Sequence, residues 1–174
     1  VLFDMVIHGF NPKSPVVQSR PDIFIHEPDG RPALHPTWKS VSTDWASPAY
    51  HQYMMEVVLH DLKEFEIDGY RVDAASFKGP NWSGDAAYPA YRSACDSPAL
   101  LKSRLGVMRK VKPEAILLNE VFGPVFYTAF NLSHDNQTEA PQQFLEKLAA
   151  GEVNAAHYKQ HLADVFDMLP PGAN

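Results

Sequence analysis

Short apolar runs alternate along the chain with stretches whose apolar side chains recur at helical spacing. Val1–Ile7 is an apolar, β-branched run typical of a buried strand. Ser47-Pro48 combines an N-cap residue with a proline at the first helical position, and apolar side chains then recur at helical spacing from Tyr50 to Phe65. A second short strand follows over residues 67–75 and ends in charged residues. The pattern predicts a strand, a helix and a strand in that order.

The same cycle continues toward the C-terminus. We expect a helix from Ser97-Pro98 to about Val111, and strands at Ala115–Val121 and near Tyr127–Leu132. Two more helices are expected near Pro141–Ala150 and Asn154–Leu169. Such alternation favours parallel strands joined by right-handed helical crossovers, hence an α/β sheet or barrel. A complete eight-stranded barrel needs about 250 residues, so the four predicted strands suggest a barrel truncated at both ends.

The segment from about residue 8 to residue 46 interrupts this alternation. It is rich in proline and contains Pro-Asp, Asp-Gly and His-Pro turn signals. We therefore expect one domain, residues 1–174, that carries a long loop insertion at about 8–46. A loop of this length is often a lid or a binding loop, although a plain surface insertion remains an alternative.

The composition excludes several classes of binding partner, whereas it says little about the fold. The formal net charge of -6 disfavours nucleic acid and anionic membranes, since both attract basic surfaces. No apolar run approaches the roughly 20 residues that span a bilayer. Cys95 is the only cysteine, so no internal disulfide can form, and the histidines show no zinc-hydrolase spacing. The compartment, cytoplasmic or secreted, stays open for a chain we expect to be soluble.

Three carboxylates interrupt the apolar strands: Asp4, Asp73 and Glu120. Buried strands rarely contain acids without partners, and the C-terminal ends of parallel strands converge on one rim. Two acids that face each other there suit glycoside hydrolysis, in which one carboxylate attacks the sugar and the other donates a proton. The alternative is a structural Arg71–Asp73 ion pair with a solvated Glu120.

Arg71 shares a strand face with Asp73, so its guanidinium can hold Asp73 ionised as the nucleophile. Glu120 follows an aliphatic run, surroundings that can raise its pKa toward that of a general acid. In a retaining enzyme the two carboxyl groups lie about 5–5.5 Å apart. The aromatic residues in or beside the long loops are candidates to stack on sugars or simply to pack the loops; they are Trp38, Trp45, Trp82 and Tyr91.

The stretches that contain Asp4, Asp73 and Glu120 resemble the α-amylase family, glycoside hydrolase family 13. Val1–Gly9 is similar to the family's first sequence block, with Asp4 matching its aspartate. Gly69–Ala75 matches the second block, with Arg71 and the nucleophile Asp73 two apart, and Ile116–Phe122 matches the third, with Glu120 as acid/base. Pro21–Phe24, Asp29-Gly30 and Asp44–Pro48 also look like the family's third loop and third helix.

The resemblance implies about strands 3 to 6 of a (β/α)8 TIM barrel with their helices. It implies catalysis by Asp73, Glu120 and Arg71, and carbohydrate contacts by Asp4, His8 and Phe122. The implied activity is a retaining glycoside hydrolase or transglycosylase acting on α-glucosidic bonds through a covalent glycosyl-enzyme intermediate. The alternative is a non-catalytic, amylase-like binding or scaffold protein.

The chain departs from the family pattern at several positions. The fourth block, with the third carboxylate, is not reached, so we expect the isolated chain to be inactive; Ser133–Asn136 only imitates that block, although His134 or Asp135 could line the cleft. His8-Gly9 replaces the usual Asn-His, which makes a calcium site possible but doubtful, and no other cofactor is expected. Ser76-Phe77 replaces the Lys-His of starch-degrading members, so starch is not singled out as the substrate.

Overall fold

A four-stranded parallel sheet organises the chain. The computed structural model describes residues 1–35, 38–75, 97–120, 129–134 and 141–169. The strands lie in the order β1-β4-β5-β6, with every neighbouring pair parallel. They are β1 (Leu2–Val6), β4 (Gly69–Asp73), β5 (Ile116–Asn119) and β6 (Leu132–Ser133). The predicted parallel α/β arrangement is confirmed.

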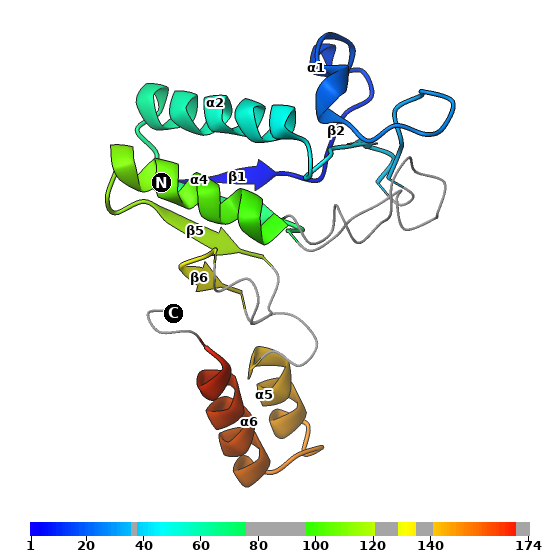
Figure 1. Ribbon diagram of the computed structural model, residues 1–174. Coiled ribbons are helices and arrows are strands. Elements are labelled where there is room, and N and C mark those ends of the chain that lie inside the picture. The colour runs from blue at the N-terminus through cyan, green and yellow to red at the C-terminus, as the bar shows by residue number, and fades with distance from the viewer. Residues whose placement is uncertain (36–37, 76–96, 121–128, 135–140, 170–174) are drawn as a thin grey trace.

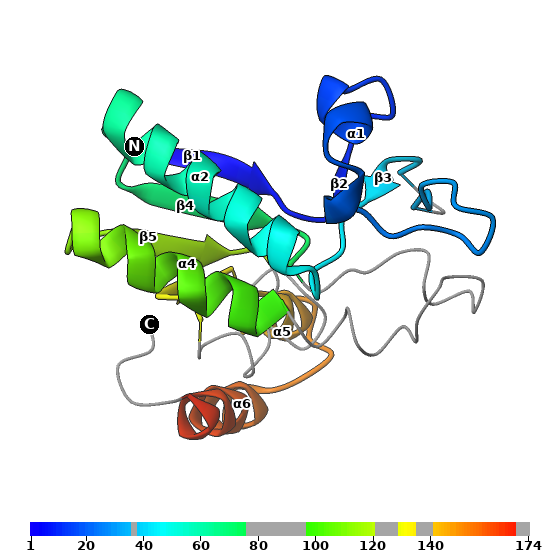
Figure 2. The ribbon, with the colours of Figure 1, turned by 45° about the horizontal axis from the view of Figure 1, so that its top comes forward.

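Two helices cover one face of this sheet (Figure 2). Helix α2 (Pro48–Glu64) begins as predicted, because the Ser47 side chain accepts a hydrogen bond from the Tyr50 N–H and Pro48 fits the first turn. Helix α4 (Ser97–Val111) packs beside it. Apolar side chains of both helices join those of the strands in the main core: Met5, Met54, Val58, Leu62, Tyr70, Val72, Leu100, Leu101, Met108 and Leu117.

The strands alternate between this core face and an open face. Tyr70 and Val72 of β4 are buried toward the helices, whereas Arg71 and Asp73 point the other way and are only partly buried. In β1, likewise, Met5 is buried while Leu2 and Val6 are exposed. The prediction of a buried strand at Val1–Ile7 therefore holds for Met5 and Ile7 but not for Val1, Leu2 and Val6. The chemistry-bearing side chains lie on the face that α2 and α4 do not cover.

The segment between β1 and α2 is more structured than a plain loop insertion. It contains β2 (Gly9–Phe10), α1 (Pro15–Ser19), the 3₁₀ helix η1 (Pro21–Ile23) and β3 (Val41–Ser42), and β2 pairs antiparallel with β3. This segment lies beyond the C-terminal ends of the sheet strands (Figures 1 and 2).

The carbonyl of Ile7 anchors this segment to the end of β1. It accepts hydrogen bonds from Thr43 Oγ1 at 2.5 Å, Tyr50 Oη at 2.7 Å and Trp45 Nε1 at 2.8 Å. All three donors are buried side chains, so this contact fixes where the chain leaves the sheet. The next residue, His8, is thereby held at the same end of the sheet as the predicted acids.

The C-terminal helices form a pair of their own (Figure 1). Helices α5 (Pro141–Ala149) and α6 (Ala155–Met168) pack on each other, and the rings of Phe144 and His161 stack with centroids 4.4 Å apart. Both helices match the predicted ranges closely. In the part of the chain that the structure describes, no helix is both long and apolar enough to cross a bilayer.

Candidate active site

Arg71 stands at the centre of a cluster of three carboxylates. Its Nη1 donates to Asp73 Oδ1 at 2.6 Å and to Asp4 Oδ1 at 2.8 Å, and its Nη2 donates to Glu120 Oε1 at 2.5 Å. The guanidinium and the carboxylates of Asp73 and Glu120 are each about three-quarters buried, whereas Asp4 is largely exposed. We call these four residues the acid cluster. Charge-assisted bonds of this kind are among the stronger hydrogen bonds in proteins.

Strand register explains why residues so far apart in sequence meet. Asp4 of β1 lies directly opposite Arg71 of β4, and Asp73 is the last residue of β4. Glu120 follows β5 directly, and its N–H donates to the Val72 carbonyl, so it extends β5 alongside Asp73. Since adjacent strands are about 4.8 Å apart, side chains on one face at one end come within hydrogen-bonding reach of one guanidinium.

Ala74 contributes a backbone contact that the sequence did not predict. Its φ of 46° is left-handed, which is unusual for a residue other than glycine. In this conformation its N–H donates to Glu120 Oε2 at 2.7 Å. Both oxygens of Glu120 therefore accept a hydrogen bond, one from Arg71 and one from the turn after Asp73. Strained backbone of this type is common at functional sites.

His8 contacts the second oxygen of Asp73. Its Nε2 lies 3.2 Å from Asp73 Oδ2, and the imidazole itself is buried. Asp73 is thus held from two sides, by Arg71 on Oδ1 and by His8 on Oδ2. The sequence predicted a sugar contact for His8, whereas the structure places it against the predicted nucleophile.

The neighbouring carboxylates stabilise the charged form of Arg71. The hydrogen bond to Asp4, followed by that to Asp73 and by the charge of Glu120, raises the pKa of Arg71 above its ordinary value, against an opposing effect of burial. Arg71 is therefore a permanent cation. It offsets part of the repulsion among three acids that would otherwise be forced together.

Of the other predicted site residues, some lie near the acid cluster, some are buried in the core, and some fall outside the described residues. Asp4 joins the cluster, but it is the third of five residues in β1 rather than a strand-end residue. Phe122, like Asp135, Trp82 and Tyr91, lies outside the described residues. His134 follows β6, where its N–H donates to the Asn119 carbonyl. Trp45 is completely buried, so it packs the core and does not stack on a sugar.

The described residues do not fit a metal ion. They contain no group of three or more His, Cys, Asp or Glu side chains arranged to hold one. Calcium prefers oxygen ligands, whereas the position that resembles the calcium-associated asparagine offers the His8 imidazole, whose Nε2 engages Asp73. Arg71 already occupies the space among the carboxylates with its own charge.

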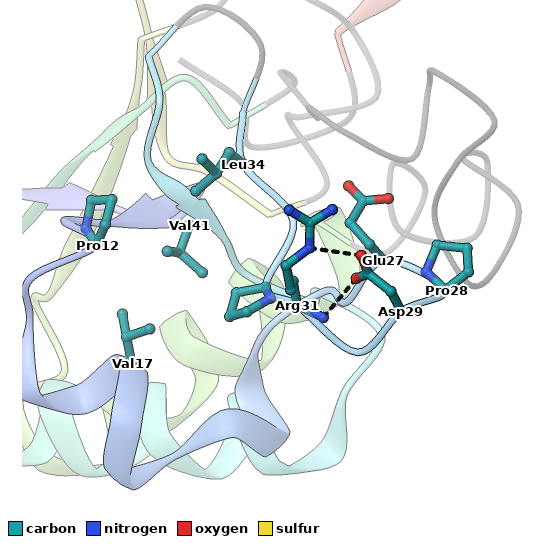
Figure 3. A pocket seen from close by; sticks show the side chains of 9 residues that line it. Pro12, Val17, Glu27, Pro28, Asp29, Arg31, Leu34 and Val41 are labelled. Carbon is teal, nitrogen blue, oxygen red and sulfur yellow. Dashed lines mark hydrogen bonds and ion pairs between the residues drawn. The ribbon is translucent and has the colours of Figure 1, made fainter.

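A hollow of about 800 Å³ lies away from the acid cluster, in the segment between β1 and α2. Figure 3 shows the ion pair of Arg31 with Asp29 on its wall. No residue of β4 or β5 lines this hollow, so it is distinct from the candidate active site. The lining residues are Pro12, Val17, Glu27, Pro28, Asp29, Arg31, Pro32, Leu34 and Val41.

Solved structures provide the comparison with known proteins, since no family model and no curated protein matches the chain. A maltogenic α-amylase from Thermotoga neapolitana matches with a TM-score of 0.75 and 21% identity, over 99% of this chain and 36% of that one. An α-amylase from Lactobacillus plantarum matches with a TM-score of 0.74 and 18% identity, over 99% and 40%.

A cyclic α-maltosyl-(1→6)-maltose hydrolase from Arthrobacter globiformis matches with a TM-score of 0.65 and 14% identity, over 97% of this chain and 39% of the other. The chain thus spans between about a third and two fifths of the length of these structures. At such low identity the likeness concerns the fold. The chain has the fold of part of these α-amylase and related hydrolase structures.

Proposed function

We propose that the chain is part of the catalytic (β/α)8 barrel of a retaining glycosidase of the α-amylase family, acting on α-glucosidic bonds. The observation that carries this proposal is the single guanidinium of Arg71 bonded to both Asp73 and Glu120. These two acids come from adjacent strands and lie on one face at one end of the sheet. The fold shared with α-amylases supports the proposed glycosidase activity, although a fold alone does not determine chemistry.

Asp73 is the nucleophile in this proposal. Its contacts with Arg71 at Oδ1 and with His8 at Oδ2 fix the orientation of the carboxylate. A nucleophile and an acid that share one guanidinium lie close together. This supports the spacing of about 5–5.5 Å found in retaining enzymes over the roughly 6.5–9.5 Å of inverting ones.

Glu120 is the general acid and then the general base. As the acid it gives a proton to the leaving oxygen while Asp73 forms the glycosyl-enzyme bond. As the base it takes a proton from the water or sugar hydroxyl that releases the product. Each of its oxygens accepts one hydrogen bond in the structure, one from Arg71 and the other from the Ala74 N–H. Each carboxyl oxygen has a second lone pair, so Glu120 can hold and donate a proton while these contacts remain.

Turnover of maltooligosaccharides by the intact protein tests this function. We expect the anomeric proton signals of the first product, followed by NMR, to show the α configuration of the substrate. Asp73→Asn and Glu120→Gln should each lower kcat by about 10³-fold or more. Glu56→Gln, an exposed carboxylate on α2, is the matched control and should retain wild-type turnover.

Two results would reject the proposal. Products that first appear in the β configuration would exclude the retaining mechanism. Full activity of Asp73→Asn would exclude Asp73 as the nucleophile. Binding of maltooligosaccharides with no turnover by the wild-type protein would favour the non-catalytic binding role.

A further inference from the structure

Trp38 lies at the end of the sheet where the acid cluster lies, next to His8. The His35 N–H donates to the Ser40 carbonyl at 2.8 Å, and the Lys39 N–H donates to the His35 carbonyl at 3.0 Å. Lys39 has a left-handed φ of 56°, and the Trp38 N–H donates to Nδ1 of His35. These contacts hold His35, Trp38, Lys39 and Ser40 close together.

The indole of Trp38 is one side chain away from the predicted nucleophile. Its ring centroid lies 4.1 Å from that of His8 and 4.1 Å from that of His35, and the latter pair is stacked at 19°. His8 in turn contacts Asp73 Oδ2. Both imidazoles are buried, whereas Trp38 remains 44% exposed. The two histidines thus support a large aromatic surface that stays open to solvent beside the acid cluster.

Gly9 of β2 lies close to Ser40 and Val41. A Cβ atom at position 9 would lie 2.4 Å from Ser40 Oγ, 2.8 Å from Ser40 Cβ and 2.9 Å from the Val41 carbonyl oxygen. A histidine at position 9, as in the family's usual Asn-His pair, would clash with both residues. Glycine at position 9 therefore allows β2 to approach Ser40 and Val41 this closely.

The contrast with Trp45 separates a binding role from a packing role. Trp45 is 0% exposed and uses its indole N–H to hold the Ile7 carbonyl. Trp38 packs against two buried imidazoles and is 44% exposed, which is the state expected of an aromatic side chain that meets a ligand. A pyranose ring offers an apolar C–H face of matching size, and its hydroxyl groups remain free for polar contacts.

We propose that Trp38 is a stacking platform for a glucose unit of an α-glucan chain, adjacent to the unit attacked by Asp73. The inference rests on the proposed function and names a residue that sets how the substrate binds. It predicts that affinity for a chain long enough to reach Trp38 depends on an aromatic ring at position 38.

Binding of maltoheptaose to the intact protein tests the platform. Titration calorimetry in the Glu120→Gln background avoids turnover and keeps the contact between His8 and Asp73. Adding Trp38→Ala should weaken binding about tenfold, whereas Trp38→Phe should stay within about threefold because it keeps a ring. Phe65→Ala removes an exposed aromatic side chain at the opposite end of the sheet and should leave the affinity unchanged.

The outcomes separate the platform from the proposed function. Equal maltoheptaose affinity of the Trp38→Ala and parent proteins would overturn the platform and leave the glycosidase proposal standing. A tenfold loss in Trp38→Phe as well as in Trp38→Ala would show that a ring at this position is not what binds, and would also overturn it. Absence of both maltoheptaose binding and wild-type turnover would overturn the two proposals together.

Discussion

Arg71 makes three of the contacts that define the candidate active site. Its guanidinium has five N–H donors in a fixed plane. Here it donates to three carboxylates on one face of the sheet, from β1, from β4 and from the residue after β5. Without this cation, Asp4, Asp73 and Glu120 would repel one another at close range. Its effect on stability follows from the charge it supplies.

Arg71→Met should destabilise the protein by about 2 kcal/mol at pH 7, because it removes charge-assisted hydrogen bonds from partly buried carboxylates. The contacts with Asp4 and Asp73 raise the pKa of Arg71 above its ordinary value in the folded state, so Arg71 is charged at pH 7 and, as the pH rises, its contribution is lost only in strong alkali. Urea unfolding at pH 7 measures the effect.

Arg31→Met is the matched control for this substitution. Arg31 pairs with Asp29 in an exposed position, where solvent screens the ion pair, so the loss of stability should be much smaller than in Arg71→Met. Equal losses of stability in the two variants would mean that the acid cluster is no tighter than a surface ion pair.

Sequence alone could predict Arg71, Asp73 and Glu120 because their positions follow from two simple periodicities. Alternate residues of a strand share a face, and parallel strands end at one rim. The left-handed Ala74 and the stack of Trp38 on two histidines could not be predicted in this way. The first depends on a turn geometry that alanine does not favour, and the second on a close approach between segments about 30 residues apart.

Gly69 determines how closely β4 approaches β5. Its φ is 154°, and a Cβ atom there would lie 1.9 Å from the Ile116 carbonyl oxygen, which is backbone and cannot move aside. The ladder that places Glu120 next to Asp73 starts at this point, since Gly69 is in register with Ile116. An added methyl group must push the strands apart.

Gly69→Ala should therefore destabilise the protein by about 3 kcal/mol, the upper part of the range for overpacking. Gly106→Ala gives the opposite expectation, because Gly106 lies inside α4 and its Cβ would meet nothing within 4 Å. Alanine should stabilise that helix by about 0.5–1 kcal/mol. Thermal unfolding of both variants measures the difference, and a tolerated Gly69→Ala would contradict the described strand spacing.

Lys112 joins the end of α4 to the turn before β4. Its Nζ donates to the carbonyls of Glu66 and Ile67 and to the carboxylate of Asp68. The hydrogen bond from Lys112 lowers the pKa of Asp68. Because the folded-state pKa is then below the ordinary 3.8, the contribution to stability is present above about pH 4 and is lost as the pH falls through the folded-state value.

In Lys112→Met, the pKa of Asp68 should rise toward its ordinary value, and less stability should be lost as the pH falls below about 4. NMR titration of the Asp68 carboxyl group measures the first effect, and unfolding curves at several pH values measure the second. Lys110→Met, on the same helix, should change neither. An unchanged titration of Asp68 in Lys112→Met would show that this contact is absent in solution.

The elements with strong helical spacing were predicted to within a few residues. Helix α2 and its Ser47 cap are the clearest case, since both the local signals and the apolar spacing point to the same boundary. The segment between β1 and α2 was predicted only as a loop insertion. Its strands β2 and β3 are two residues long and are defined by their pairing with each other, which no local pattern reveals.

At the scale of the whole molecule, the order of the parallel strands brings the candidate site residues together. Three neighbouring parallel strands supply Asp4, Arg71, Asp73 and Glu120, two helices cover the opposite face, and the segment after β1 adds His8 and Trp38 at the C-terminal end of the strands. The matched α-amylase structures are more than twice as long as this chain. The activity proposed here therefore concerns the intact protein.

Covalent trapping tests the central claim most directly. The intact protein is incubated with 5-fluoro-α-glucosyl fluoride, whose electron-withdrawing fluorine slows release of a glycosyl-enzyme, and is then digested and analysed by mass spectrometry. We predict a glycosyl label on the peptide that contains Asp73, and its loss in Asp73→Asn. A label on Glu120 or another residue, or no label on a protein that turns over maltooligosaccharides, would contradict the assignment of Asp73 as the nucleophile.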